Sequence, residues 1–245
     1  MIEYLNNIDG QVFLFLNGLH LDAFDHAVKM FSGRFIWIPM YATILYILFR
    51  TCHLKQVMIY TAAIGLAILL TDQTCATFIR PFVERLRPAN LDNPLSEFTH
   101  IVDGYRGGKY GFPSCHAANS FALAVFLSCL VARKRFVIFI FGWAILNSYS
   151  RIYLGVHYPG DLIVGATIGS FYGWLTYSMA KHFDRMPRQL FRERQNEEIA
   201  RIPVGFSFSG YLIRINTHSI VVTDIMICVF SLTLMFIIAS SIIIG

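Results

Sequence analysis

Apolar and polar stretches alternate along this chain of 245 residues, and most of the apolar stretches are long. A helix needs about 20 mainly apolar residues to cross a bilayer. Stretches near this length predict about six spans, at residues 34–50, 56–79, 117–132, 135–150, 160–180 and 219–244. Because the alternation typical of a transmembrane β-barrel is absent from the sequence, we predict an all-α fold, a polytopic transmembrane helical bundle.

The first part of the chain breaks this pattern. Its apolar run at 12–16 is too short to span, and polar residues such as His20 and Asp22 follow it. We predict that residues 1–33 form an N-terminal interfacial segment, an amphipathic helix along the membrane surface. The remainder divides into a transmembrane core at 34–180, a basic cytoplasmic connector at 181–218 and a C-terminal transmembrane helix at 219–245. Residues 189–201 of the connector suit a surface helix, and a plain solvated linker is the alternative.

Composition agrees with a membrane protein, because 56% of the residues are hydrophobic, 14% are charged and the mean hydropathy is +0.55. A soluble domain carries about a quarter charged residues. The net charge of +5 is too small and too scattered among apolar stretches to indicate nucleic acid, so the expected partner is the lipid bilayer. The five cysteines show no CxxC pair and no metal-ligand spacing, and we therefore expect no metal, no cofactor and no disulfide framework.

A charged stretch between two apolar segments, residues 150–161, holds the strongest chemical signal. Arg151, His157 and Asp161 would be costly at membrane depth without a purpose. Pro159 favours the first turn of a helix, which places Asp161 in that turn and His157 just before it. A carboxylate bonded to one imidazole nitrogen makes the other nitrogen a better nucleophile or base. The alternative is a histidine at a helix terminus that is capped by a local carboxylate.

Two further polar clusters flank the loop that precedes the third predicted span. Arg80 and Arg87 are seven residues apart, so both can lie on one face at the end of the second span, where Pro88 would stop the helix. The third span opens with Ser114, Cys115 and His116, and a helix N-terminus favours anions. Taken singly, each has an ordinary explanation: the arginines suit a basic membrane edge, Ser114 an N-cap, and His116 an interfacial histidine. Together the clusters bring arginines, histidines, a serine and an aspartate to one membrane edge, as phosphoryl transfer needs.

In these three clusters the chain resembles the type 2 phosphatidic acid phosphatase (PAP2) family. The family pattern is K-x6-R-P, P-S-G-H and S-R-x5-H-x3-D, and this chain has R-x6-R-P at 80–88, P-S-C-H at 113–116 and an unbroken third motif at 150–161. The departures are Arg80 in place of lysine and Cys115 in place of glycine. Arg80 keeps the charge and Cys115 keeps its backbone N–H, so neither departure removes a catalytic group.

The resemblance implies an integral membrane phosphatase that hydrolyses a lipid phosphate through a phosphohistidine, without a metal. His157 would be the nucleophile, oriented by Asp161, and His116 would protonate the leaving oxygen and then activate water. The remaining motif residues would bind phosphate: Arg80, Arg87, Ser114, Cys115 and Arg151. The family leaves four candidate substrates open: undecaprenyl diphosphate, phosphatidylglycerophosphate, phosphatidic acid and the phosphates of lipid A. The loop at 89–112 either covers the pocket and helps to choose among them or is a plain connector.

Two other functions fit parts of the pattern. A transporter could use the arginines as an anion path, but the charges gather at one edge and no predicted span is broken at its centre. A degenerate structural relative is disfavoured because His116, His157 and Asp161 are all present.

Basic residues also predict the topology. The loops at 51–55, 133–135 and 181–218 share one side and carry most of the Lys and Arg that the motifs do not explain. This side is expected in the cytoplasm. The site would then face the periplasm or exterior of an inner membrane. The oligomeric state is left open.

Overall fold

The computed structural model describes residues 2–184, 207–208, 211–212 and 222–244, and the structural statements below concern these residues. The α-helices are α1 (Ile2–Asn17), α2 (Asp22–Phe31), α3 (Ile38–Thr51), α4 (Leu54–Asp72), α5 (Arg80–Val83), α6 (Cys115–Val131), α7 (Lys134–Tyr153), α8 (Pro159–Phe183) and α10 (Val222–Ile244). Shorter elements are the 3-10 helices η1 (Phe35–Trp37), η3 (Pro94–Phe98) and η4 (Val102–Gly104), the π-helix η2 (Gln73–Ile79), and the paired strands β1 (Ser207–Phe208) and β2 (Tyr211–Leu212). The predicted surface helix at 189–201 lies outside the described residues.

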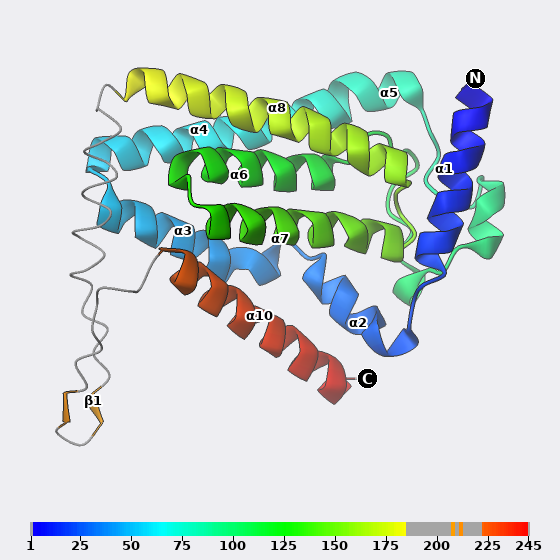
Figure 1. Cartoon of the computed structure of the whole chain (residues 1–245). Coiled ribbons are helices and arrows are strands. Elements are labelled where there is room, and N and C mark those ends of the chain that lie inside the picture. The colour runs from blue at the N-terminus through cyan, green and yellow to red at the C-terminus, as the bar shows by residue number, and fades with distance from the viewer. Residues whose placement is uncertain (1, 185–206, 209–210, 213–221, 245) are drawn as a thin grey trace.

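Helix α6 lies at the centre of the bundle, between α4, α7 and α8 (Figure 1). Its contact with α8 is close because glycines recur every fourth residue on the facing side of α8. A side chain on any of them would collide with a backbone carbonyl of α6. The facing pairs are Gly165 with Ser114, Gly169 with Ala118, and Gly173 with Ala122. Small residues that allow helix backbones to touch are the usual packing device of membrane helices.

The second predicted span is longer than expected and ends differently. Helix α4 continues through the wide π-helical turn η2 into α5, so that one rod runs from Leu54 to Val83. Glu84 ends it in the left-handed conformation, with φ of 48°. Leu86 then pairs in extended form with Tyr110. The prediction that Arg87 lies on the same helix face as Arg80 is therefore wrong, because Arg87 follows the helix in an extended segment.

The N-terminal residues form two helices. Helix α1 crosses the end of the bundle, where α7 ends and α8 begins (Figure 1). The buried side chain of Asn17 fixes the C-terminal end of α1. The amide nitrogen of Asn17 donates to the carbonyls of Ile152 and Tyr153, each at 3.0 Å. Its amide oxygen accepts the backbone N–H of His100 at 2.8 Å. Helix α2 packs against α10 at the other side of α7.

Length and composition identify three described helices that can cross a membrane: Leu54–Val83, Lys134–Tyr153 and Asp224–Ile242. The count rises to four if α2 and the η1–α3 segment, which meet at an angle of 66°, form one bent span. The all-α prediction is confirmed, but about six spans are not. Helix α3 has 14 residues and α6 has 17, so at the usual rise each alone is shorter than the hydrocarbon core.

Candidate active site

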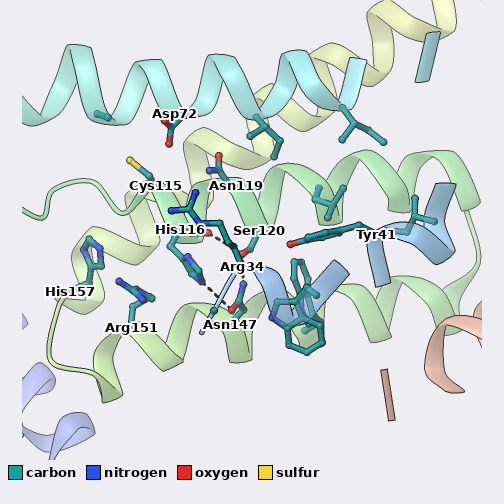
Figure 2. A pocket seen from close by; sticks show the side chains of 18 of the residues that line it. Arg34, Tyr41, Asp72, Cys115, His116, Asn119, Ser120, Asn147, Arg151 and His157 are labelled. Atoms are coloured by element: carbon teal, nitrogen blue, oxygen red, sulfur yellow. Dashed lines mark hydrogen bonds between the residues drawn. The ribbon is translucent and has the colours of Figure 1, made fainter. Parts of the chain in front are cut away.

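The three polar clusters of the sequence meet around one cavity of about 790 Å³. Figure 2 shows it between α4, α6 and α7, with His116, Arg151 and His157 together at one end. Of the predicted site residues, six line the cavity: Arg80, Arg87, Cys115, His116, Arg151 and His157. Ser114 and Asp161 are fully buried behind them.

His157 lies in the short connection between α7 and α8, and its side chain is buried. Nδ1 is 3.3 Å from Oδ2 of Asp161, in the first turn of α8. The same oxygen accepts the backbone N–H of Tyr158 at 3.0 Å, which fixes the carboxylate. Nε2, on the opposite side of the ring, is 3.2 Å from Nη1 of Arg87.

These contacts select one tautomer of His157. A carboxylate accepts and a guanidinium donates, so Nδ1 carries the proton and Nε2 presents its lone pair. Burial, together with the charges of Arg87, Arg151 and Arg80, lowers the pKa of His157 well below its ordinary value. The ring is therefore neutral near pH 7, and the electron pair of Nε2, which accepts from Arg87, lies at the cavity end of the site.

Three arginines surround this end of the cavity. Arg87 is buried and donates to the carbonyls of Tyr110 at 3.1 Å and Val156 at 3.2 Å. Burial and the charges of Arg80 and Arg151 lower its pKa to about 10, so it remains charged near pH 7.

The other two arginines each have an N–H group that is not used in a hydrogen bond within the described residues. Arg80 donates through Nη2 to the carbonyl of Pro113 and to Sγ of Cys115, both at 3.1 Å. Arg151 donates to the hydroxyls of Ser32 at 2.7 Å and Tyr105 at 3.3 Å. The Nε atoms of both arginines are buried and have no partner in the described structure. Clustered cations with unused donors favour an anion such as phosphate.

The second motif forms the N-terminus of α6. Ser114 is its N-cap, and its hydroxyl accepts the N–H of Ala117 at 3.4 Å. The backbone N–H of Ser114 donates to the carbonyl of Asp161 at 3.0 Å, so α6 and α8 start side by side. This junction joins the second motif to the third.

His116 is held by a residue that the sequence analysis missed. Its Nε2 donates to Oδ1 of Asn147 at 3.1 Å, and the amide of Asn147 donates to Ser120 at 2.9 Å. Asn147 is an amide in an apolar helix, one turn before Arg151, and that position is the signal that could have identified it.

Arg85 and Asp9 form a second layer behind the His157–Asp161 pair. Arg85 donates from Nη1 to Asp161 at 2.9 Å and contacts Asp9 at 2.7 Å, and its guanidinium lies over the ring of Tyr158. Asp9 also accepts the N–H of Gly160 at 2.8 Å. The sequence analysis did not include Arg85 or Asp9 in the site. No local signal marks Asp9, because the fold brings it here from α1.

The cavity lining includes no residue of the loop at 89–112. The loop supports the site from outside the cavity, because Tyr105 contacts Arg151, and Tyr110 and Asn93 both bond to Arg87. In the described residues, one group could hold a metal ion, formed by His20, Asp22 and His100, and none of the three lines the cavity.

Comparison with known proteins agrees with this geometry. The profile of the PAP2 superfamily matches residues 56–185. A lipid A 4'-phosphatase of Bacteroides thetaiotaomicron is 54% identical over 180 residues, which cover 74% of this chain and 80% of that protein. A lipid A 4'-phosphatase of Porphyromonas gingivalis is 34% identical over 178 residues, covering 73% and 75%.

Solved structures lead to the same family. The crystal structure of Aquifex aeolicus LpxE is similar with a TM-score of 0.53 and 26% identity, over 69% of this chain and 93% of that one. A transmembrane PAP2-type phosphatidylglycerolphosphate phosphatase from Bacillus subtilis shares the fold, with a TM-score of 0.58 and 16% identity over 75% of this chain and 90% of that one. The chain therefore belongs to the PAP2 superfamily and is a membrane lipid phosphatase.

Proposed function

We propose that the protein removes the 4'-phosphate of lipid A through a phosphohistidine intermediate. The observation that carries this proposal is the His157–Asp161 pair, which leaves Nε2 as an electron-pair donor beside three arginines. The likeness to two lipid A 4'-phosphatases favours lipid A among the four candidate substrates. The cavity supports a lipid, because it continues from the charged end into an apolar part.

The first step transfers the phosphoryl group to His157. Nε2 forms a bond to phosphorus while the bond from phosphorus to the sugar oxygen breaks, and His116, in the fraction of molecules in which it is protonated, gives its proton to that oxygen. Asp161 holds Nδ1–H, which orients the ring and stabilises the positive charge that develops on it.

The second step returns the enzyme to its starting state. Water attacks phosphorus, His116 takes a proton from it, and the bond from nitrogen to phosphorus breaks with its electron pair returning to Nε2. Arg80, Arg87 and Arg151, with Ser114 and the backbone N–H of Cys115, would bind the non-bridging oxygens in both steps. These residues suffice for the chemistry, so we propose that hydrolysis needs no metal.

We also propose the predicted arrangement in the membrane, with about six spans and the site facing the periplasm or exterior. In Figure 1 the α3–α4 and α6–α7 connections lie at the opposite end of the bundle from the start of α8. Basic residues such as Arg133 and Lys134 are at the connection end. The bias of Lys and Arg toward the cytoplasm favours this orientation.

The test is phosphate release by purified protein in detergent. Lipid A, phosphatidic acid, phosphatidylglycerophosphate and undecaprenyl diphosphate are supplied separately, with chelator and with orthovanadate, a mimic of the transferring phosphoryl group. We expect lipid A to lose its 4'-phosphate, vanadate to inhibit and EDTA to have no effect. His157→Ala should be inactive, and His182→Ala, an exposed histidine at the end of α8, is the matched control. No release from lipid A, or full activity of His157→Ala, would contradict the proposal.

A further inference from the structure

The lining of the cavity changes from charged to polar to apolar along its length, and three helical segments show the same change. On α4 and α5 the lining passes from Arg80 to Asp72 and then to Ile68 and Ile64. On α6 it passes from His116 to Asn119 and then to Leu123. On α7 it passes from Arg151 to Asn147 and then to Trp143. Arg34, in the turn before η1, lies beside the polar part, and Tyr41 and Leu48 of α3 line the apolar part. The cavity therefore has a cationic end, a polar middle and an apolar end.

The proposed mechanism uses the cationic end and leaves the polar middle without a role. Asp72 and Arg34 line this middle, and neither forms an ion pair in the described part of the chain. Oδ1 of Asn119 is buried and has no hydrogen-bond partner there. Figure 2 shows the three side chains around the same part of the cavity, from α4, α6 and the turn before α3. A buried amide oxygen without a partner is costly, and the exposed charges of Asp72 and Arg34 face the same part of the cavity, so together they indicate a binding function.

The three side chains differ in what they can bind. Asp72 and Oδ1 of Asn119 accept hydrogen bonds, whereas Arg34 donates them. A carboxylate here repels a second phosphate, so the middle suits an uncharged group that has both donors and acceptors. A saccharide with hydroxyl and amide groups meets this requirement. The diacylglyceryl group of phosphatidic acid offers ester carbonyls and no donors, and a polyprenyl chain offers neither.

We infer that Arg34, Asp72 and Asn119 form a subsite for the saccharide leaving group, next to the phosphate site and between it and the apolar end of the cavity. The inference rests on the proposed function, because lipid A carries its phosphates on an acylated glucosamine disaccharide. The order of the cavity then matches the order of the substrate. Phosphate lies against the arginines, the sugar lies in the polar middle, and an acyl chain lies along apolar residues such as Ile64, Leu123 and Trp143. These three side chains would select the sugar-bearing phosphate over other lipid phosphates.

The test compares two substrates on the same purified preparation, so that any inactive fraction of protein cancels. The measured quantity is kcat/KM for lipid A divided by kcat/KM for phosphatidic acid. Asp72→Asn and Asn119→Leu should each lower this ratio by about tenfold, the usual result of losing one hydrogen bond to a charged group or leaving one unmade. Gln73→Ala is the control, because Gln73 is the next residue along the helix and does not line the cavity.

The outcomes separate the two proposals. If the wild type hydrolyses lipid A and neither variant changes the ratio, the subsite is wrong and the proposed function stands. Equal losses on both substrates would indicate a structural role and would also overturn the subsite. If the wild type hydrolyses phosphatidic acid but releases nothing from lipid A, the proposed function fails, and the subsite fails with it.

Discussion

Arg85 donates from Nη1 to Oδ1 of Asp161 across 2.9 Å, and the other oxygen of this carboxylate lies 3.3 Å from Nδ1 of His157. The carboxylate is fully buried, so an unpaired charge there would be costly. Arg85 compensates for this charge, and Asp9 holds Arg85 in turn from α1. The orientation of His157 therefore depends on a helix at the far N-terminal end of the chain.

Arg85→Gln should lower kcat by about 10- to 100-fold, the effect usually seen when a residue that orients a metal-binding histidine or carboxylate is removed. Substrate KM should change little, because Arg85 does not line the cavity. Arg85→Lys should recover part of the loss. The matched control is Arg106→Gln, because Arg106 binds Ala89 and Ser96 in the loop and has no contact with Asp161. A large rise in KM with unchanged kcat would contradict the orienting role.

His116→Gln should lower the rate by about 10² to 10⁴, the usual contribution of a positioned acid or base. The loss should be smaller for a substrate whose leaving group needs no proton, such as an aryl phosphate that releases a phenol of low pKa. The comparison requires single-turnover kinetics of phosphoryl transfer for both substrates. Equal losses for good and poor leaving groups would rule out His116 as the acid.

Cys115→Gly should retain activity within a few-fold of the wild type, and Arg80→Lys should lose only a modest part of the activity. The thiol contacts Arg80 through Sγ at 3.1 Å, but Arg80 also donates to the carbonyl of Pro113. Cys115→Gly leaves this second bond in place, and Arg80→Lys keeps a positive charge beside the same carbonyl. Phosphate release from lipid A is the measurement. Complete inactivity of folded Cys115→Gly would mean that the thiol itself takes part in the reaction.

The pH profile should report the depressed pKa of His157. The protonated ring cannot attack phosphorus, so activity is lost as pH falls through its pKa. Because burial and the neighbouring arginines lower this pKa, kcat/KM should fall only below pH about 6.5, the ordinary value for histidine. Arg87→Gln removes one of those charges and should move the acid limb to higher pH, whereas Arg87→Lys should leave it in place. An acid limb that does not move in Arg87→Gln would contradict the assignment to His157.

The proposed topology can be checked with single cysteines in a background that lacks other accessible thiols. Leu91 is exposed in the loop near the site, and Lys134 is exposed at the start of α7. A membrane-impermeant maleimide added to intact cells should label Leu91→Cys and spare Lys134→Cys. The reverse pattern would place the site in the cytoplasm. Asn93 in the same loop is unsuitable for labelling, because its amide donates to the carbonyl of Arg87 and the hydroxyl of Tyr158 and so supports the site.

Local sequence predicted the parts of the site that follow from local structure. Ser114 caps α6 and Pro159 opens α8, as their positions next to apolar runs indicated. The position of Arg87 was mispredicted because a left-handed residue at Glu84 ends the helix before it, and spacing alone does not reveal such a residue.

The contacts that depend on the whole fold were not predictable in this way. Asp9 meets Arg85 only because α1 crosses the end of the bundle, and a single sequence carries no signal for that pairing. The polar middle of the cavity was missed for a similar reason. Asp72 and Asn119 look like isolated polar residues until α4 and α6 are placed side by side.

The glycine contact between α6 and α8 has a consequence for how freely this chain can vary. Gly165, Gly169 and Gly173 do not line the cavity, yet a methyl group on any of them would meet backbone at the N-cap of α6 or within α6 rather than a movable side chain. Ser114 and Asp161 sit at the starts of these same two helices. In a library of random variants selected for activity, these glycines should therefore tolerate as little replacement as His157, although their function is purely spatial.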